Sequence, residues 1–388
     1  MTQNNNDKKA LALHKKLRGK IRITPAMAIK DRAALSLIYT PGVAAVSTLI
    51  AKNPKLSREY TIKGRMIAVI SDGSAVLGLG NIGPYGALPV MEGKAALFKT
   101  FADVDAFPIV LTSPPRLQSA SAEEYIDFIV ETICAIAPGF AGINLEDFAA
   151  PNCFEIEERL KARLDIPVMH DDQHGTAIAV LAALINAVKV VKKDFKKIKV
   201  VVSGAGAAGT AITKLLHLAG IADVIVLDSK GIIDASRKEP HKQELANLTN
   251  PRRIEGGLVD ALLGADVFVG VSGPNLMGAK EVALMAQGAI IFAMANPTPE
   301  ISPKEALKGG AAIVSTGRSD YTNQINNLLV FPGVFKGALE HGVSKITDEM
   351  KLKAAHNLAA LVKKPTAQKI IPGAFEKGVA AAVARAIK

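Results

Sequence analysis

Two pairs of acidic residues lie in the middle of the chain, and each pair follows a short apolar run. Glu146 and Asp147 follow the first run, and Asp171 and Asp172 follow the second. Carboxylates held close together repel one another unless a cation lies among them. Oxygen atoms are the ligands that Mg²⁺ and Mn²⁺ prefer, whereas Zn²⁺ prefers histidine and cysteine. The four acids are therefore candidate ligands for Mg²⁺ or Mn²⁺; the alternative is that they only stabilise helix N-termini.

Two strands and a helix between them would bring the acid pairs together. The apolar runs 141–145 and 166–169 have the length of buried strands, and residues 151–164 have the length and apolar spacing of a crossover helix. Strands joined by such a helix lie parallel to each other. Because ligands bind at the carboxyl ends of parallel strands in open α/β sheets, we expect the four carboxylates to converge at one edge.

A glycine-rich motif in the second half of the chain indicates dinucleotide binding. A β-branched run leads into glycines spaced as GxGxxG, a helix follows, and a second strand ends at Asp228. This turn lets a pyrophosphate approach the backbone, and the terminal acid accepts hydrogen bonds from the adenosine ribose. Asp228 favours NAD because a carboxylate repels a 2′-phosphate, whereas Lys230 favours NADP. The residues expected to bind the cofactor here are Gly204, Ala205, Gly206, Ala207, Ala208, Gly209 and Asp228.

Lys94 and Tyr39 are candidates for proton transfer. A glycine-rich passage at 73–86 leads to Lys94 at the expected start of an apolar helix, where the helix dipole would lower its pKa. A lysine with a lowered pKa can act as a general base, and the alternative is a solvated lysine. Tyr39 precedes a turn fixed by Pro41 and Gly42, which would present its phenol. A tyrosine in such a position usually serves packing instead.

Three further apolar runs complete a parallel sheet around the glycine motif. They cover 266–271, 289–294 and 311–315, and each ends in a polar or glycine-rich turn. Those turns lie at the carboxyl edge of the sheet, where cofactor and substrate would bind. Asn296 and Asn327 are candidates for amide contacts there, although an asparagine before a proline is also an ordinary turn signal.

Length and composition indicate a soluble protein of two domains. A chain of 388 residues is too long for one ordinary core, and 49% hydrophobic with 21% charged residues is typical of globular proteins. We find no apolar run long enough to cross a membrane, and the first residues lack the apolar centre of a signal peptide. Two cysteines agree with a reducing compartment. We therefore expect a cytoplasmic protein without a membrane partner.

The formal net charge of +11 does not indicate nucleic-acid binding. Lysine and arginine are scattered along the chain, and the 5% of aromatic residues do not interleave with the short basic clusters. A positive field equally favours an anionic substrate and a dinucleotide. We therefore expect no nucleic-acid partner.

Eight motifs, in one order along nearly the whole chain, resemble those of the short bacterial-type malic enzymes. They are YTPGVA (39–44), SDGSAVLGLGNIGP (71–84), LPVMEGKA (88–95), INLEDF (143–148), HDDQHGTA (170–177), GAGAAG (204–209), ANPTPE (295–300) and TNQINNLLVFPG (322–333). The resemblance implies oxidative decarboxylation of L-malate to pyruvate and CO₂ with reduction of NAD, or alternatively NADP. It also implies a divalent metal, Mg²⁺ or Mn²⁺, and a homodimer.

The resemblance also implies a role for each candidate residue. Lys94 would take the proton of the C2 hydroxyl, and Tyr39 would protonate the enol at C3. The implied metal ligands are Glu146, Asp147 and Asp172, with Asp171 in a supporting role. Asn296 and Asn327 would contact the substrate, and Asn296 also the cofactor. Ala75 stands where larger family members have an arginine for the substrate carboxylate.

The expected fold is α/β, with an N-terminal substrate and metal domain at 1–160 and a Rossmann-type, doubly wound parallel-sheet domain at 161–388. A C-terminal helix at 366–388 would pack back on the N-terminal domain. Two other functions fit the same residues. The chain could be a 2-hydroxy-acid or amino-acid dehydrogenase without decarboxylation, or a non-catalytic dinucleotide sensor, although a sensor has no need of the tyrosine, the lysine and the acids together.

Overall fold

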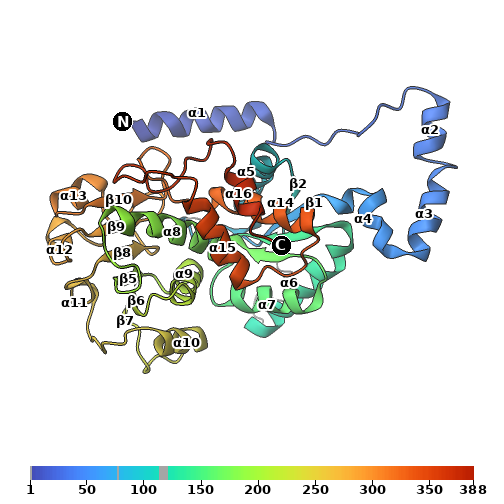
Figure 1. The fold of residues 1–388 in the computed structure, drawn as a ribbon. Coiled ribbons are helices and arrows are strands. Elements are labelled where there is room, and N and C mark those ends of the chain that lie inside the picture. Colours follow the sequence, from blue (N-terminus) through green and yellow to red (C-terminus); the bar gives the residue numbers. More distant parts are fainter. Residues whose placement is uncertain (1, 77, 113–120) are drawn as a thin grey trace.

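The computed structural model describes residues 2–76, 78–112 and 121–388, so Leu77 of the glycine-rich motif lies outside the described part. Two mainly parallel sheets lie beside each other with helices around them (Figure 1). An N-terminal helix, α1 (Thr2–Leu17), runs along one side of this body, and an arm of short helices extends away from it. The expected α/β class with two parallel-sheet units is confirmed.

The first sheet contains four parallel strands in the order β2-β1-β3-β4. The strands are β1 (Met66–Ser71), β2 (Asp105–Val110), β3 (Gly142–Leu145) and β4 (Val168–His170). Because β2 and β3 lie on opposite sides of β1, the direction of winding reverses between β1 and β3. The carboxyl ends of strands at such a reversal form a crevice that suits a ligand.

Three helices cover the two faces of this sheet. They are α5 (Gly83–Ala102), α6 (Ala122–Ile136) and α7 (Asn152–Arg163). Side chains alternate along β1, so Ile67 and Val69 face the core that includes α5, whereas Ala68 and Ile70 face α6 and α7. The predicted crossover helix between β3 and β4 is α7, and a capping box formed by Ser121 and Glu124 begins α6. The parallel pairing of β3 with β4 is confirmed.

The second sheet has the order β10-β9-β8-β5-β6-β7, in which β7 alone pairs antiparallel. Its strands are β5 (Lys199–Ser203), β6 (Asp223–Asp228), β7 (Gly231–Ile232), β8 (Val267–Gly270), β9 (Ile290–Ala293) and β10 (Ile313–Thr316). The helices between them are α9 (Ala207–Leu218), α10 (Pro240–Leu248), α11 (Leu258–Leu262), α12 (Ala279–Val282) and α13 (Pro303–Lys308). The winding reverses between β5 and β8, directly beside the GxGxxG turn, as a dinucleotide-binding sheet requires.

A long buried helix, α8 (Asp171–Val190), joins the two sheets. It starts directly after β4, and nearly all of its residues from Ala177 to Val188 are fully buried. The same hydrophobic core contains residues of β1, α5, α8, β5 and α9. This alanine-rich helix therefore forms the centre of a core that the two sheets share.

The C-terminal part differs from the expected single helix. The helices here are α14 (Phe331–His341), α15 (Asp348–Ala359) and α16 (Val379–Ala384), and the prediction of one helix over 366–388 is wrong. Pro372 and Gly373 interrupt the apolar pattern, and Gly378 adopts a φ of +88°, so the helix begins only after it. The short α16 packs on α14 and α15 and also contacts α5.

An arm at the N-terminal side projects away from both sheets (Figure 1). It carries α2 (Arg32–Ile38), α3 (Val43–Lys52) and α4 (Ser57–Tyr60), whose residues are all exposed or half-buried. By length and apolarity alone, the stretches Arg32–Lys52 and Asp171–Val190 could each span a membrane, but the second is mainly buried in the core. The first is broken by the turn after Tyr39, so it is two short helices.

Phe98 tests the packing that joins α5 to α14. Its buried ring lies edge-on to Phe331 and Phe335, with centroid distances of 4.7 and 5.5 Å. We expect Phe98→Ala to lower the free energy of unfolding by about 3–5 kcal/mol because it leaves a cavity in the core. Phe375→Ala removes a ring that is 88% exposed and should cost less than about 1 kcal/mol. Urea unfolding monitored by circular dichroism measures both, and equal losses would contradict this packing.

Candidate active site

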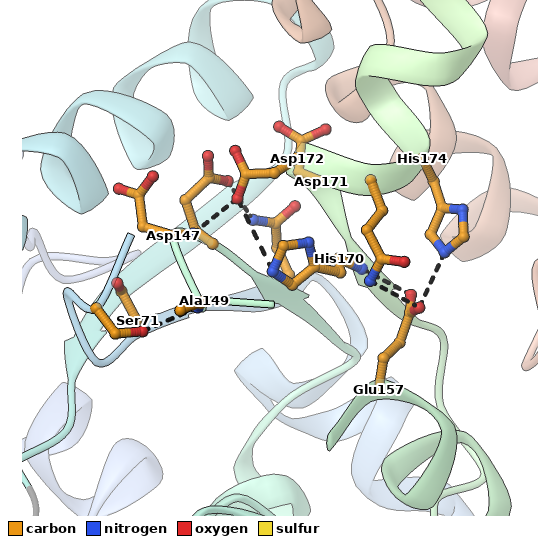
Figure 2. A network of polar contacts seen from close by, with 12 residues as sticks. Ser71, Asp147, Ala149, Glu157, His170, Asp171, Asp172 and His174 are labelled. Carbon is orange, nitrogen blue, oxygen red and sulfur yellow. Dashed lines mark hydrogen bonds and ion pairs between the residues drawn. The ribbon is translucent and has the colours of Figure 1, made fainter. Parts of the chain in front are cut away.

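Three acidic side chains meet at the carboxyl edge of the first sheet. Glu146 and Asp147 follow β3, and Asp172 lies in the first turn of α8; ligand oxygens of all three lie within 4.8 Å of one another. Asp147 has a φ of +58°, which turns the chain directly after β3. The backbone N–H of Asp147 donates to Asp172 Oδ2 at 2.8 Å (Figure 2). The predicted convergence of the two acid pairs is therefore present for these three carboxylates.

The cluster has the chemistry of a site for a hard divalent cation. Its donors are carboxylate oxygens, which suit Mg²⁺ or Mn²⁺. Glu146 and Asp147 are almost fully buried, and Asp172 is partly exposed toward the cleft. Burial raises the pKa of Glu146 well above its usual range, although Lys94 opposes the shift. Carboxylates this close repel one another, and a bound divalent cation would relieve the repulsion.

Lys94 lies beside the cluster, but not at the start of a helix as predicted. Helix α5 begins at Gly83, so Lys94 lies three turns inside it, on the same buried face as Met91, Ala95 and Phe98. This spacing carries a charged side chain into the core. The helix dipole therefore does not act on Lys94 in the expected way.

The surroundings of Lys94 also reverse the predicted direction of its pKa. Its Nζ lies 2.5 Å from Asp171 Oδ2, 2.9 Å from Glu146 Oε1 and 4.4 Å from the centre of the Phe331 ring. Burial opposes the charge of the ammonium, but Asp171 and Glu146 outweigh this effect and raise the pKa of Lys94. The expected lowered pKa is wrong. Asp171, expected in a supporting role, is the close partner of Lys94.

Tyr39 is not brought to this site within the chain. It caps α2 on the projecting arm, and the residue is 65% exposed. Figure 1 places α2 and α3 far from the first sheet. Within one copy of the described chain, the tyrosine and the lysine that the sequence associates with proton transfer are therefore separated.

A cleft of about 730 Å³ lies between the two sheets and opens onto Asp172. Asn296 and Asn327 both line it, as do Ala75 and Gly78 of the glycine-rich passage. A Cβ atom on Gly78 would lie 1.8 Å from the backbone oxygen of Asn296, so only glycine lets the two halves of the chain approach here. The two candidate asparagines therefore face the same space as an acid of the cluster.

The GxGxxG turn forms the other wall of the cleft. A Cβ atom on Gly209 would lie 1.7 Å from the oxygen of Gly204, whereas Gly206 has open space at the same point. The first turn of α9 and Gly206 line the cleft, so backbone N–H groups at the start of a helix face it. Such a helix start binds the pyrophosphate of a dinucleotide.

Asp228 ends β6 as predicted, but two cations that the sequence did not single out hold it. Arg237 donates to both carboxylate oxygens at 2.9 Å, and Lys242 Nζ lies 2.9 Å from Oδ2. Burial alone would raise the pKa of Asp228, but the hydrogen bonds from Arg237 and Lys242 lower it far below its usual range. No spacing rule connects an aspartate with an arginine nine residues later, so the sequence carried no signal for this pair.

Glu300 joins the two turns that border the cofactor side of the cleft. Its buried carboxylate accepts the backbone N–H of Ser272 and that of Ala295, each at 3.0 Å. Ser272 lies in the turn after β8 and Ala295 in the turn after β9, so the Glu300 side chain fixes these two turns relative to each other. The second turn also carries Asn296. Glu300 lies within the ANPTPE motif, but its type alone did not distinguish it from a surface acid.

Glu157 is a second buried acid that the sequence analysis missed. It lies on α7 and accepts the backbone N–H of His170 at 2.8 Å, while His174 Nε2 lies 2.9 Å away (Figure 2). Burial opposes its ionisation, but His174 and Lys161 outweigh burial and lower the pKa of Glu157 far below its usual range. Glu157 lies on the buried, apolar face of α7 with Cys153. A charged residue on an apolar helix face was the signal in the sequence that could have identified it.

A dinucleotide-binding sheet that faces an acid-lined cleft defines the class of the protein as a nicotinamide-dependent oxidoreductase. Comparison with protein families gives the particular member of this class. The family model described as malic enzyme, N-terminal domain, matches residues 18–161, and that described as malic enzyme, NAD binding domain, matches residues 173–387. The chain belongs to the malic enzyme family.

Individual relatives agree with this assignment. The chain is 50% identical to a bifunctional malic/malolactic enzyme of Bacillus subtilis, with 97% of this chain and 91% of that protein covered. It is 51% identical to an NAD-dependent malic enzyme of Geobacillus stearothermophilus, with 95% and 76% covered. The structure of an NAD-dependent malic enzyme from Thermotoga maritima superposes with a TM-score of 0.90 at 48% identity, covering 98% of each chain.

Proposed function

We propose that this protein catalyses the divalent-metal-dependent oxidative decarboxylation of L-malate to pyruvate and CO₂, with NAD as the hydride acceptor and NADP as an alternative. The observation that carries the proposal is the cleft between the sheets. Asp172 lies at one wall and the GxGxxG turn at the other. Glu146 and Asp147 have oxygens within 4.8 Å of those of Asp172, and the buried Lys94 pairs with Glu146.

The metal and the cofactor would supply the chemistry that side chains cannot. A divalent cation held by Glu146, Asp147 and Asp172 would polarise the C2 oxygen of malate, and the nicotinamide ring would accept the hydride from C2. Asn296 and Asn327 line the cleft and carry amide groups that can bind the carboxylates of malate. This suits a chain with Ala75 in place of the arginine of larger relatives.

Lys94 and its partner Asp171 would handle the proton of the C2 hydroxyl. Asp171 and Glu146 raise the pKa of Lys94, and a divalent cation bound by Glu146 would oppose this shift, because positive charge nearby disfavours the ammonium. The amine form of Lys94 would then take the proton of the hydroxyl. Hydride loss from C2 and loss of CO₂ from C3 would then leave the enolate of pyruvate, and Lys94 would return its proton to the oxygen to give the enol. The phenol of Tyr39 would donate a proton to C3 of that enol while Lys94 takes the proton of the enol oxygen, which gives pyruvate.

Asp172→Asn tests the proposed activity. With L-malate and Mn²⁺, the unmodified protein should reduce the cofactor and release pyruvate, and EDTA should stop the reaction. The variant should lose about a thousandfold or more in kcat/KM because a neutral amide binds the cation poorly, a loss of about 4 kcal/mol in transition-state stabilisation. Asp165→Asn, at an exposed position before β4, is the matched control and should keep full activity.

Other outcomes of this assay identify the alternatives. Oxaloacetate without CO₂ would indicate a 2-hydroxy-acid dehydrogenase, and dinucleotide binding without turnover would indicate a sensor. Unchanged EDTA-sensitive turnover in the Asp172 variant would contradict the proposed ligand set.

The cations around Asp228 support use of both cofactors. A free carboxylate at this place repels the 2′-phosphate of NADP, but here Arg237 and Lys242 already neutralise it. Arg237 also has the planar guanidinium that suits a phosphate. We infer that Asp228 accepts hydrogen bonds from the ribose hydroxyls of NAD, and that Arg237 binds the 2′-phosphate when NADP takes the place of NAD.

Arg237→Gln should therefore lower the use of NADP relative to NAD. Removal of the guanidinium frees Asp228 to repel the 2′-phosphate and removes a charge-assisted hydrogen bond, so the ratio of kcat/KM for NADP to that for NAD should fall about tenfold. Arg252→Gln breaks a similar pair with Asp223 at the other end of β6 and is the matched control. A ratio that is equal in the two variants would sink this role for Arg237.

The exposed arm supports a homodimer with shared sites. Leu35, Leu37 and Ile38 of α2 are 45%, 76% and 40% exposed, and Tyr39 follows them directly. An apolar helix that projects from the body suits burial against a second copy of the chain. We infer that the arm of one copy carries its Tyr39 to the acids and Lys94 of the other.

Mixing two inactive variants tests this arrangement. Tyr39→Phe and Asp172→Asn should each be nearly inactive alone. In a hybrid dimer with crossed sites, one site has neither change, so subunit exchange should restore about a quarter of the normal activity. Sedimentation should confirm dimers, and the absence of recovery in a proven hybrid would place both groups in one chain.

We also infer that the protein works in the cytoplasm. Cys134 and Cys153 are free thiols, as expected in a reducing compartment. The buried α8 and the broken helical arm both have roles within the protein, and neither has to be assigned to a membrane.

A further inference from the structure

We propose that Glu157 is a positioning residue that fixes Asp171 and Asp172 in the active site from behind, through the backbone at the start of α8. The inference rests on the proposed function, because it concerns the same acids. Glu157 lies on α7 and does not line the cleft. In Figure 2 its carboxylate lies on the other side of His170 from Asp147.

The carboxylate of Glu157 holds two points of one short segment. Oε1 accepts the backbone N–H of His170, the residue that ends β4 and precedes α8, at 2.8 Å. Oε2 lies 2.9 Å from His174 Nε2, one helical turn later. Asp171 and Asp172 lie between His170 and His174 in the chain. We call the pair of contacts from Glu157 to these two histidines the clamp, and a movement of the clamp would move both acids.

The two enclosed acids face the site, opposite the clamp. Asp171 binds Lys94, and Asp172 Oδ2 accepts the N–H of Asp147 at 2.8 Å. The start of α8 is therefore held on one side by Glu157 and on the other by Lys94 and the N–H of Asp147, which contact Asp171 and Asp172. Such second contacts set the position and affinity of metal ligands in proteins.

The charge of Glu157, and not only its shape, is needed for this clamp. Lys161 Nζ lies 3.1 Å from Oε2, so the buried carboxylate is compensated by a cation one turn along α7. A glutamine at 157 has one oxygen that accepts and an NH₂ group that only donates, so it cannot serve both the His170 N–H and the Lys161 ammonium as the carboxylate does. The neutral amide would therefore lose the ion pair with Lys161 that holds the side chain in place, although it fills the same volume.

Binding of Mn²⁺ to the whole protein without substrate tests the proposal. Glu157→Gln should raise the Kd for Mn²⁺ about 10–100-fold, as measured by electron paramagnetic resonance. Glu158→Gln is the matched control: this neighbour on α7 also pairs with Lys161, but its side chain is 72% exposed and it should leave the Kd unchanged. Binding of NAD, measured by calorimetry, should stay the same in both variants because Glu157 does not touch the GxGxxG turn.

These measurements separate positioning from a merely structural role. If Glu157 had only a structural role, Glu157→Gln would unfold at a lower temperature but would bind Mn²⁺ normally when the affinity is measured about 20 °C below that temperature. An unchanged Kd in the folded variant would therefore overturn the proposal. If that variant does not fold, hydrogen exchange in the unmodified protein decides. The His170 amide must then exchange as slowly as those of the neighbouring strand, and fast exchange would overturn the clamp. Wild-type protein that binds no Mn²⁺ would instead overturn the proposed function itself.

Discussion

Compensation of negative charge at the buried edge of the first sheet is the constraint on which the rest of the site depends. Glu146, Asp147 and Asp172 gather where water is largely excluded, and Asp171 adds a fourth acid nearby. Carboxylates in such a place need cations at short range. The ammonium of Lys94 meets part of this need, which explains why a lysine lies on a helix face that is otherwise apolar.

The same constraint is met at three further acids, each time by a different device. Glu157 has Lys161 and His174, Asp228 has Arg237 and Lys242, and Glu300 has two backbone N–H groups. In each case the acid joins segments that are distant in the sequence or fixes the end of a strand or helix. Charge is used here to hold backbone in place as much as to bind ligands.

The sequence predicted those features that depend on local pattern. Strands, the GxGxxG turn and the convergence of the acid pairs follow from apolar periodicity and from glycine geometry, which act over a few residues. The surroundings of Lys94 could not be predicted, because they depend on where α5 begins and on Phe331 and Asp171, which are far away in the chain. The partners of Asp228, Arg237 and Lys242, are close in the chain, but no spacing rule connects them with it. Tyr39 shows another limit, since its place depends on contacts that one copy does not contain.

The helix α8 has a consequence for how the molecule holds together. Its first residues are acids of the site, and its later turns lie in a hydrophobic core that residues of both sheets share. A protein of this kind cannot be divided into a catalytic module and a cofactor module that each survive alone. Either half, if excised, would expose an apolar surface that had been interior, so we expect the two halves to unfold together as one cooperative unit.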